Sequence, residues 1–128
     1  MITRAVLTLC CFLWIVDVGA DDRSYYAARR QALVKKIEGS VALLRGAADT
    51  RNYMPFRQGN DFYYLTGVEV PGAFLLLDAV QNRSILFLPA RDLRLEQSEG
   101  PRLAPGEDSR LATGVDQVLD DEMEPWHS

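Results

Sequence analysis

Residues 73–88 read AFLLLDAVQNRSILFL, and this stretch decides the fold class. It contains two short apolar runs, 73–78 and 84–88, and the residues between them include Gln81 and Asn82. Apolar runs of this length are typical of buried strands, and the polar residues between them are typical of a hairpin turn. The stretch therefore predicts two antiparallel strands.

The residues that precede this hairpin predict a further strand and a helix. Residues 40–45 (SVALLR) form a third short apolar run, and the continuous apolar character of all three runs predicts a sheet that is covered on both faces. Upstream, Ser24 is a plausible N-cap and Gly39 a stop for an amphipathic helix of about 14 residues. Its apolar stripe is expected to comprise Tyr26, Leu33, Val34 and Ile37, and its basic residues, Arg29, Arg30, Lys35 and Lys36, are expected on a solvated face.

The segment between the helix and the hairpin is rich in aromatic residues. Residues 53–58 are expected to be extended because Pro55 disfavours helix at the preceding residue. Asn60 is then expected to cap a single helical turn that ends near Gly67. The bulk of the aromatic side chains favours core packing with the hydroxyls at the rim, and a ligand surface is the alternative. These side chains are Tyr53, Phe56, Phe62, Tyr63 and Tyr64.

Beyond Pro89 the pattern predicts short helices separated by turns. One helical piece follows Asp92, and a second is expected over 107–112 before Gly114. A helix, a strand, a hairpin and further short helices indicate an α/β layered domain.

The first twenty residues have the layout of a secretory signal peptide. Arg4 precedes an apolar stretch over 5–18, and small residues at 18–20 are followed by two aspartates. The stretch is shorter than a membrane-spanning helix, although an uncleaved anchor is the alternative. Cleavage after Ala20 predicts a secreted or periplasmic protein. It would also remove Cys10 and Cys11, which leaves the mature chain without cysteine.

Composition excludes several classes of function. The net charge of −4 gives no electrostatic footprint for nucleic acid. The glycine patterns of phosphate-binding loops, GxGxxG and GxxxxGK[ST], are absent.

The chain also lacks the residues for a hydrolytic centre. Its one histidine, His127, stands next to the last residue, so a serine nucleophile would have no positioned base. Catalytic zinc normally takes histidine as well. Carboxylates at Asp120, Asp121, Glu122 and Glu124 could bind a hard cation, although a solvated acidic face is favoured. The residue types therefore predict no catalytic residue and no metal site in this chain.

Several strings nevertheless resemble a known family when they are read in order. They are YAARRQAL at 26–33, GSVALL at 39–44, FRQGNDFYYLTG at 56–67, LFLPARD at 86–92, EGPRL at 99–103 and GVD at 114–116. Together they resemble the N-terminal domain of Xaa-Pro aminopeptidase (aminopeptidase P), a relative of creatinase and prolidase. The resemblance covers about residues 25–118.

The resemblance implies a fold, an activity and a set of site residues. The fold is a mixed β-sheet flanked by helices, which precedes a pita-bread catalytic domain. In that family two manganese ions are held by two Asp, one His and two Glu of the catalytic domain, and none of these ligands maps onto this sequence. The N-terminal domain shapes the substrate entrance and the contacts of a homo-oligomer. The residues expected to contribute here are Arg57, Asp61, Tyr63, Tyr64, Arg91, Asp92 and Arg102.

One departure from the family pattern concerns a tryptophan that often precedes the GxR turn. Ser98 stands at the matching position, so either the wall that this tryptophan helps to build beside a neighbouring active site is built otherwise, or the subunit contact is altered.

The sequence thus predicts a signal peptide over 1–20, an aminopeptidase P N-terminal-type domain over 21–119, and the start of a truncated linker or helix over 120–128. The catalytic half is expected in sequence not contained in this chain, which alone should be inactive. The alternatives are a stand-alone secreted module that binds a peptide or partner, and the front domain of a prolidase-like relative.

Overall fold

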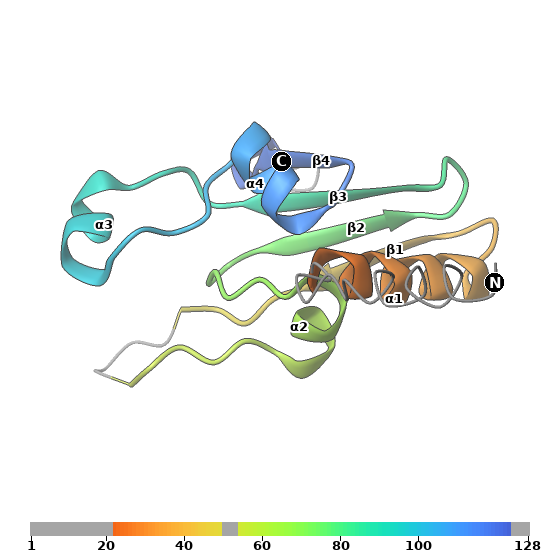
Figure 1. The fold of residues 1–128 in the computed structure, drawn as a ribbon, viewed down its shortest axis with the longest axis horizontal. Helices are drawn as coiled ribbons and strands as arrows, with labels where there is room; N and C mark the ends of the chain where they lie inside the picture. Colours follow the sequence, from red (N-terminus) through yellow and green to blue (C-terminus); the bar gives the residue numbers. More distant parts are fainter. Residues whose placement is uncertain (1–21, 50–53, 124–128) are drawn as a thin grey trace, which may run out of the picture.

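The computed structural model describes residues 22–49 and 54–123 (Figure 1). The predicted signal peptide, Tyr53 and the residues from Glu124 onward lie outside this part of the chain. The elements occur in this order: α1 (Asp22–Lys36), β1 (Val41–Arg45), α2 (Asn60–Thr66), β2 (Phe74–Asp78), β3 (Arg83–Leu88), α3 (Leu93–Glu99), α4 (Glu107–Thr113), β4 (Gln117–Asp120) and the 3-10 turn η1 (Asp121–Met123).

The four described strands form one mixed sheet in the order β1-β2-β3-β4. β1 pairs with β2 and β2 with β3 in antiparallel fashion, whereas β3 and β4 are parallel. The predicted hairpin and the predicted mixed sheet with flanking helices are therefore confirmed. β4 was not predicted, because four residues with two polar ends carry too little apolar pattern to be identified as a strand.

The sheet has two different faces. The core face carries alternate side chains that join α1 and α2 in one hydrophobic cluster; Leu75, Leu77, Leu86 and Leu88 are fully buried there, with Val118 at the β4 end. The register places the remaining apolar side chains on the opposite side, which we call the outer face. The outer face comprises Val41, Leu43, Phe74, Leu76, Ile85, Phe87 and Leu119.

Coverage of both faces, as the apolar runs predicted, is not found along β1. Its side chains alternate between exposed and half-buried, and Val41 and Leu43 remain 55% and 48% exposed. Ile85 and Phe87 in β3 are buried on the same outer face. β1 is an edge strand of the described sheet, so the outer face loses cover toward that edge.

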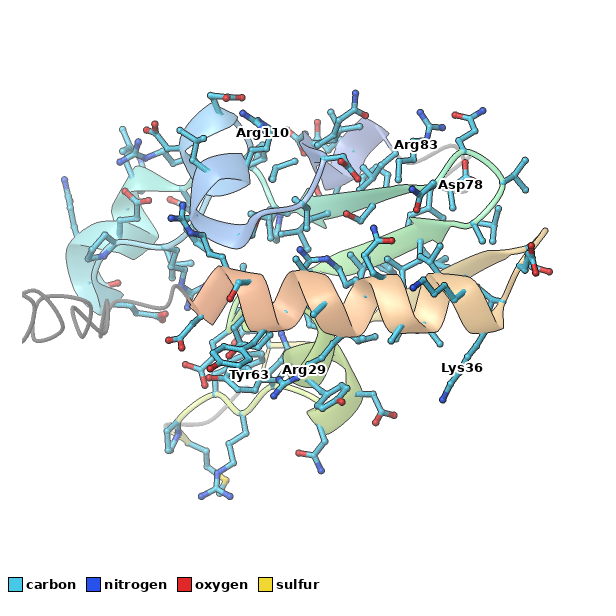
Figure 2. All side chains as sticks on the ribbon, turned by 45° about the vertical axis from the view of Figure 1, so that its right-hand side comes forward. Arg29, Lys36, Tyr63, Asp78, Arg83 and Arg110 are labelled. Atoms are coloured by element: carbon cyan, nitrogen blue, oxygen red, sulfur yellow. The ribbon has the colours of Figure 1, made fainter. Side chains whose placement is uncertain are left out.

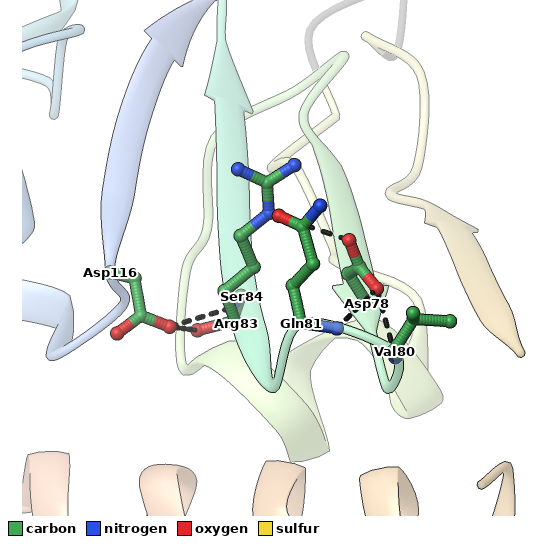
Figure 3. Close-up of polar contacts among 6 residues, drawn as sticks. All are labelled: Asp78, Val80, Gln81, Arg83, Ser84 and Asp116. Carbon is green, nitrogen blue, oxygen red and sulfur yellow. Dashed lines mark hydrogen bonds and ion pairs between the residues drawn. The ribbon is translucent and has the colours of Figure 1, made fainter. Parts of the chain in front are cut away.

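Two aspartates stabilise the β2–β3 turn (Figure 3). Asp78 stands at the start of the turn, and Asp116 lies outside it. Asp78 Oδ1 accepts hydrogen bonds from the backbone N–H groups of Val80 (2.9 Å) and Gln81 (3.0 Å). Asp116, which precedes β4, accepts hydrogen bonds from the backbone N–H (2.6 Å) and Oγ (3.2 Å) of Ser84. The second contact ties the hairpin to the chain that enters β4.

The helix ends differ in detail from the predicted ones. α1 begins at Asp22, so Ser24 lies inside the helix rather than at its N-cap. α2 begins at Asn60 after Gly59, and no side chain caps it, so Asn60 is not the cap either. The predicted stops at Gly67 and Gly114 are confirmed, since both residues end their helices in the left-handed conformation. None of the described helices has the length and apolar character needed to cross a membrane.

Candidate functional site

Helix α2 presents an aromatic surface rather than an aromatic core. Phe62 is 2% exposed and packs in the core, but the adjacent Tyr63 and Tyr64 are 42% and 55% exposed. Helical geometry explains the split, because neighbouring positions in a single short helix point about 100° apart. Core packing is therefore the wrong interpretation for Tyr63 and Tyr64, and the alternative of a ligand surface stays a prediction.

Arg29 on α1 contacts two tyrosine rings, those of Tyr64 and Tyr26. Its guanidinium carbon lies 4.3 Å from the ring centroid of Tyr64 and 5.4 Å from that of Tyr26. Its Nη1 also donates a hydrogen bond to the backbone oxygen of Tyr64 (3.2 Å). Figure 2 shows Arg29 and Tyr63 on the same side of α1. A cation stacked between two rings fixes their orientation at low entropic cost.

Tyr26 connects the two helices through a second aromatic contact. Its ring meets that of Tyr63 edge to face, with centroids 6.2 Å apart. The hydrogen bond to Tyr63, together with burial, raises the pKa of the Tyr26 hydroxyl above its ordinary value. The same ring packs on Gly67, where a Cβ atom would lie 2.5 Å from the ring.

A groove of ≈ 570 Å³ runs between α1 and α2 and reaches β1. Small and apolar side chains form its floor, and Arg29, Lys36 and Asp61 supply charges along it. It is lined by Tyr25, Ala28, Arg29, Ala32, Leu33, Lys36, Leu44, Asp61, Tyr64 and Leu65. An apolar floor with a few charges is the usual make-up of a binding groove.

Arg30 is buried beneath this surface, contrary to the prediction of a solvated basic face. It is 2% exposed, and its Nη1 donates to the backbone oxygen of Leu65 (2.9 Å) while Nη2 donates to that of Thr113 (3.4 Å). These oxygens belong to the last turns of α2 and α4, where the helix dipoles favour a cation. Burial lowers the pKa of Arg30, and Asp116 opposes that shift.

Gln58 belongs to the family string but is not among the predicted site residues. Its side chain fixes the segment that leads into α2. Its Oε1 accepts hydrogen bonds from the N–H groups of Ala47 (2.7 Å) and Gly59 (3.0 Å). Its Nε2 donates to the backbone oxygens of Val68 (3.0 Å) and Val70 (3.3 Å). One side chain thus joins the segment after β1 to both ends of α2.

The remaining predicted residues lie in another part of the molecule, the segment 91–106, which we call the α3 arm. Figure 1 shows this arm projecting from one end of the sheet. Asp92 caps α3 by accepting hydrogen bonds from the N–H groups of Arg94 (2.9 Å) and Leu95 (3.2 Å). Arg91 pairs with Glu96 (3.0 Å), and Arg102 pairs with Glu99.

The seven predicted residues therefore form two groups. Asp61, Tyr63 and Tyr64 lie on α2, with the exposed Arg57 shortly before it. Arg91, Asp92 and Arg102 stabilise the α3 arm locally. Ser98, at the position where the family often has tryptophan, is exposed and donates its hydroxyl to the backbone oxygen of Leu95 (3.0 Å).

The acidic residues after β4 are the remaining candidate for metal binding. Burial and the neighbouring Asp120 raise the pKa of Asp121. No group of three or more potential metal ligands occurs within residues 22–49 and 54–123. Glu124 and His127 lie outside these ranges.

Comparison with known proteins places this fold. The sequence model of the aminopeptidase P N-terminal domain matches residues 26–124. The Xaa-Pro aminopeptidase of Escherichia coli (strain K12) is 42% identical over 106 residues, which are 76% of this chain and 24% of that protein. A probable Xaa-Pro aminopeptidase of Fusarium vanettenii is 31% identical over 91 residues, which are 65% of this chain and 19% of the relative.

Solved structures give the same result. The zinc-substituted E. coli aminopeptidase P in complex with product superimposes with a TM-score of 0.68 at 40% identity, over 77% of this chain and 24% of that one. The E. coli enzyme with the inhibitor Pro-Leu gives 0.68 at 38% identity, with the same coverage. The chain thus spans about a quarter of the length of these relatives. Because the domain model covers most of the chain and the fold agrees, this chain belongs to the family of aminopeptidase P N-terminal domains.

Proposed function

We propose that this chain is the N-terminal, non-catalytic domain of an exported Xaa-Pro aminopeptidase. The full enzyme would remove the N-terminal residue that precedes proline, and its catalytic half would come from polypeptide that follows this chain. The observation that carries the proposal is the match of residues 26–124 to the N-terminal domain alone, at about a quarter of the length of the relatives.

The described residues do not fit the metal centre that this activity would need. They contain no cluster of three or more histidine, cysteine or carboxylate side chains able to hold an ion. We propose that the catalytic half holds two manganese ions, and no catalytic step is assigned to this chain.

The contribution of this domain would be to binding. On α2, Asp61 and the exposed Tyr63 and Tyr64 offer a carboxylate and aromatic faces, and Arg57 adds a cation nearby. Such groups bind peptides through stacking and charge, which supports a role at the substrate entrance. The α3 arm, with Arg91, Asp92 and Arg102, projects from the sheet, which supports a role in contacts within a homo-oligomer.

Extension of the reading frame beyond Ser128 tests the proposal. The longer product, with manganese added, is expected to release the first residue from peptides with proline in second position, and a chelator should abolish this activity. The 128-residue chain alone should release nothing under the same conditions. Manganese-dependent release by that chain alone would contradict the proposal that this domain is non-catalytic.

Export is tested separately, by expression with the leader intact. Recovery outside the cytoplasm of a chain that begins at Asp21 is expected. Retention of Met1 on a cytoplasmic product would contradict export while leaving the assignment of the domain untouched.

A second candidate function, a stand-alone secreted binding module, is favoured by the groove between α1 and α2. A frame that closes after Ser128, combined with micromolar binding of a short peptide in that groove, would favour this candidate. Loss of the binding in a Tyr64→Ala variant would locate the ligand there.

A further inference from the structure

We infer that the outer face of the sheet is a docking surface for the polypeptide that follows residue 123 in the full-length protein. The inference rests on the proposed function, because it requires that such a polypeptide exists. It concerns a different surface from the α1–α2 groove and the α3 arm.

Each of the four strands contributes apolar side chains to the outer face. In one row across the sheet the register places Leu43 beside Leu76 and Leu76 beside Ile85. In another row Phe74 lies beside Phe87 and Phe87 beside Leu119. Each of these apolar residues stands at a strand position where a sheet with a solvated face would carry a polar side chain.

Most polar groups of this surface stand at its ends; the exception is the exposed Gln117, at the start of β4 beside Ile85. Arg45, at one end of β1, places its guanidinium carbon 5.8 Å from the ring centroid of Phe74. At the other end Asp78 and Arg83 form an ion pair (3.4 Å). An apolar patch with a polar rim is the usual form of a surface that another polypeptide covers.

The cover is incomplete in the part of the chain that the structure describes. Ile85 and Phe87 are 5% and 4% exposed, Phe74 and Leu76 are half-buried, and Leu43 and Val41 are 48% and 55% exposed. The exposed fraction thus rises from β3 to β1. The core face shows no such gradient over β2 and β3, where Leu75, Leu77, Leu86 and Leu88 are all fully buried.

The occupant follows from where the chain leaves the sheet. β4 contributes Leu119 to the outer face and ends at Asp120, and η1 follows directly. The relatives continue for about three further lengths of this chain. An apolar sheet face is normally buried against another element, and polypeptide that leaves β4 is in position to complete the outer face.

A cysteine introduced on the outer face tests this docking. Leu43→Cys is introduced both into the 128-residue chain and into the longer product of the extended frame, and alkylation at position 43 is followed by mass spectrometry of the peptide that contains it. Val80→Cys is the matched control, because Val80 is 67% exposed on the β2–β3 turn. Val41→Cys, also on β1, is the second probe and is used if Leu43→Cys does not fold.

We expect alkylation at position 43 to be at least tenfold slower in the longer protein than in the 128-residue chain, with the Val80 control changed by less than twofold. Equal alkylation rates at position 43 would overturn the inference. Protection in the short chain that grows with protein concentration would also overturn it, because a second copy would then be the occupant. A reading frame that closes after Ser128 would overturn it as well.

The aminopeptidase activity of the same longer protein is measured in parallel. An active protein without protection at position 43 would contradict the docking inference alone. Protection at position 43 without activity would contradict the proposed function alone.

Discussion

Arg30 on α1 and Arg102 in the α3 arm carry the same guanidinium group, and they differ in what that group holds together. Arg30 is buried and binds carbonyl oxygens in the last turns of two helices that are far apart in the sequence. Arg102 is half-buried and pairs with Glu99, three residues away. The region around α1 and α2 is therefore stabilised by long-range polar contacts, whereas the α3 arm is stabilised by its own neighbours. Substitutions in the two regions should differ accordingly.

Arg30→Met should have the largest effect on stability. It removes two charge-assisted hydrogen bonds and leaves the oxygens of Leu65 and Thr113 buried without that donor, which should lower the free energy of unfolding by about 3 kcal/mol. Urea denaturation followed by circular dichroism measures the change. The matched Arg102→Met variant removes an ion pair near the surface and should lose less than about 1 kcal/mol. Equal losses in the two variants would break the comparison.

Gly67→Ala tests the contact between α2 and the Tyr26 ring. Gly67 and Gly114 both end a helix with nearly the same left-handed backbone, φ 66° and 71°. A Cβ atom at Gly67 would lie 2.5 Å from Tyr26, while at Gly114 the nearest atom is at 3.7 Å. Both alanines carry the backbone penalty, so the additional loss at Gly67, about 2 kcal/mol, reports the clash. Thermal or urea denaturation of the two variants gives the difference, and a value near zero would mean that the Tyr26 ring moves aside freely.

Gln58→Leu should lower the free energy of unfolding by about 1.5 kcal/mol, because it leaves partly buried backbone groups on either side of α2 without their partner. Gln97→Leu in the α3 arm is the control, since Gln97 is exposed, and it should change stability by less than about 0.5 kcal/mol. Denaturant midpoints of both variants test this pair. A larger loss at Gln97 would contradict the anchoring role of Gln58.

Asp92→Ala should have the smallest global effect, because it acts within the α3 arm. Loss of this N-cap is expected to destabilise α3 by about 1 kcal/mol, which corresponds to roughly fivefold faster amide exchange over Leu93–Glu99. Hydrogen exchange detected by mass spectrometry measures it. Asp108→Ala lies in the first turn of α4, where no side chain caps the helix, and serves as the control. Faster exchange that spreads to the sheet would show that the arm is not independent.

The positions of most elements could be predicted from local pattern, and the candidate site only in part. The hairpin, the first helix and the helix after Asp92 follow from apolar spacing and from turn and capping residues. Tyr63 and Tyr64 could be chosen from the sequence, but their exposure could not be predicted, because a helix of seven residues does not determine which side meets the core. Arg29 was assigned to a solvated face, although it stacks on Tyr64.

Arg30 shows what the helical spacing indicated and what it did not. It stands four residues after Tyr26 and four before Val34, so the helical period places it on the apolar stripe. Its charge nevertheless favoured the solvated face, because a buried guanidinium needs partners. Those partners are backbone oxygens in α2 and α4, which no local pattern indicates.

The sequence by itself determined most of the strands and helices but not β4, together with the family and the lack of a hydrolytic set of residues, because these depend on residue type and on spacing within short segments. Only the tertiary structure decided which face of the sheet is covered, that Arg30 is buried, and that the seven predicted residues divide between α2 and the α3 arm. Those features depend on contacts between segments 35 or more residues apart, such as Arg30 with Leu65 and Thr113. The packing of distant segments, rather than the chemistry of any one of them, sets these contacts.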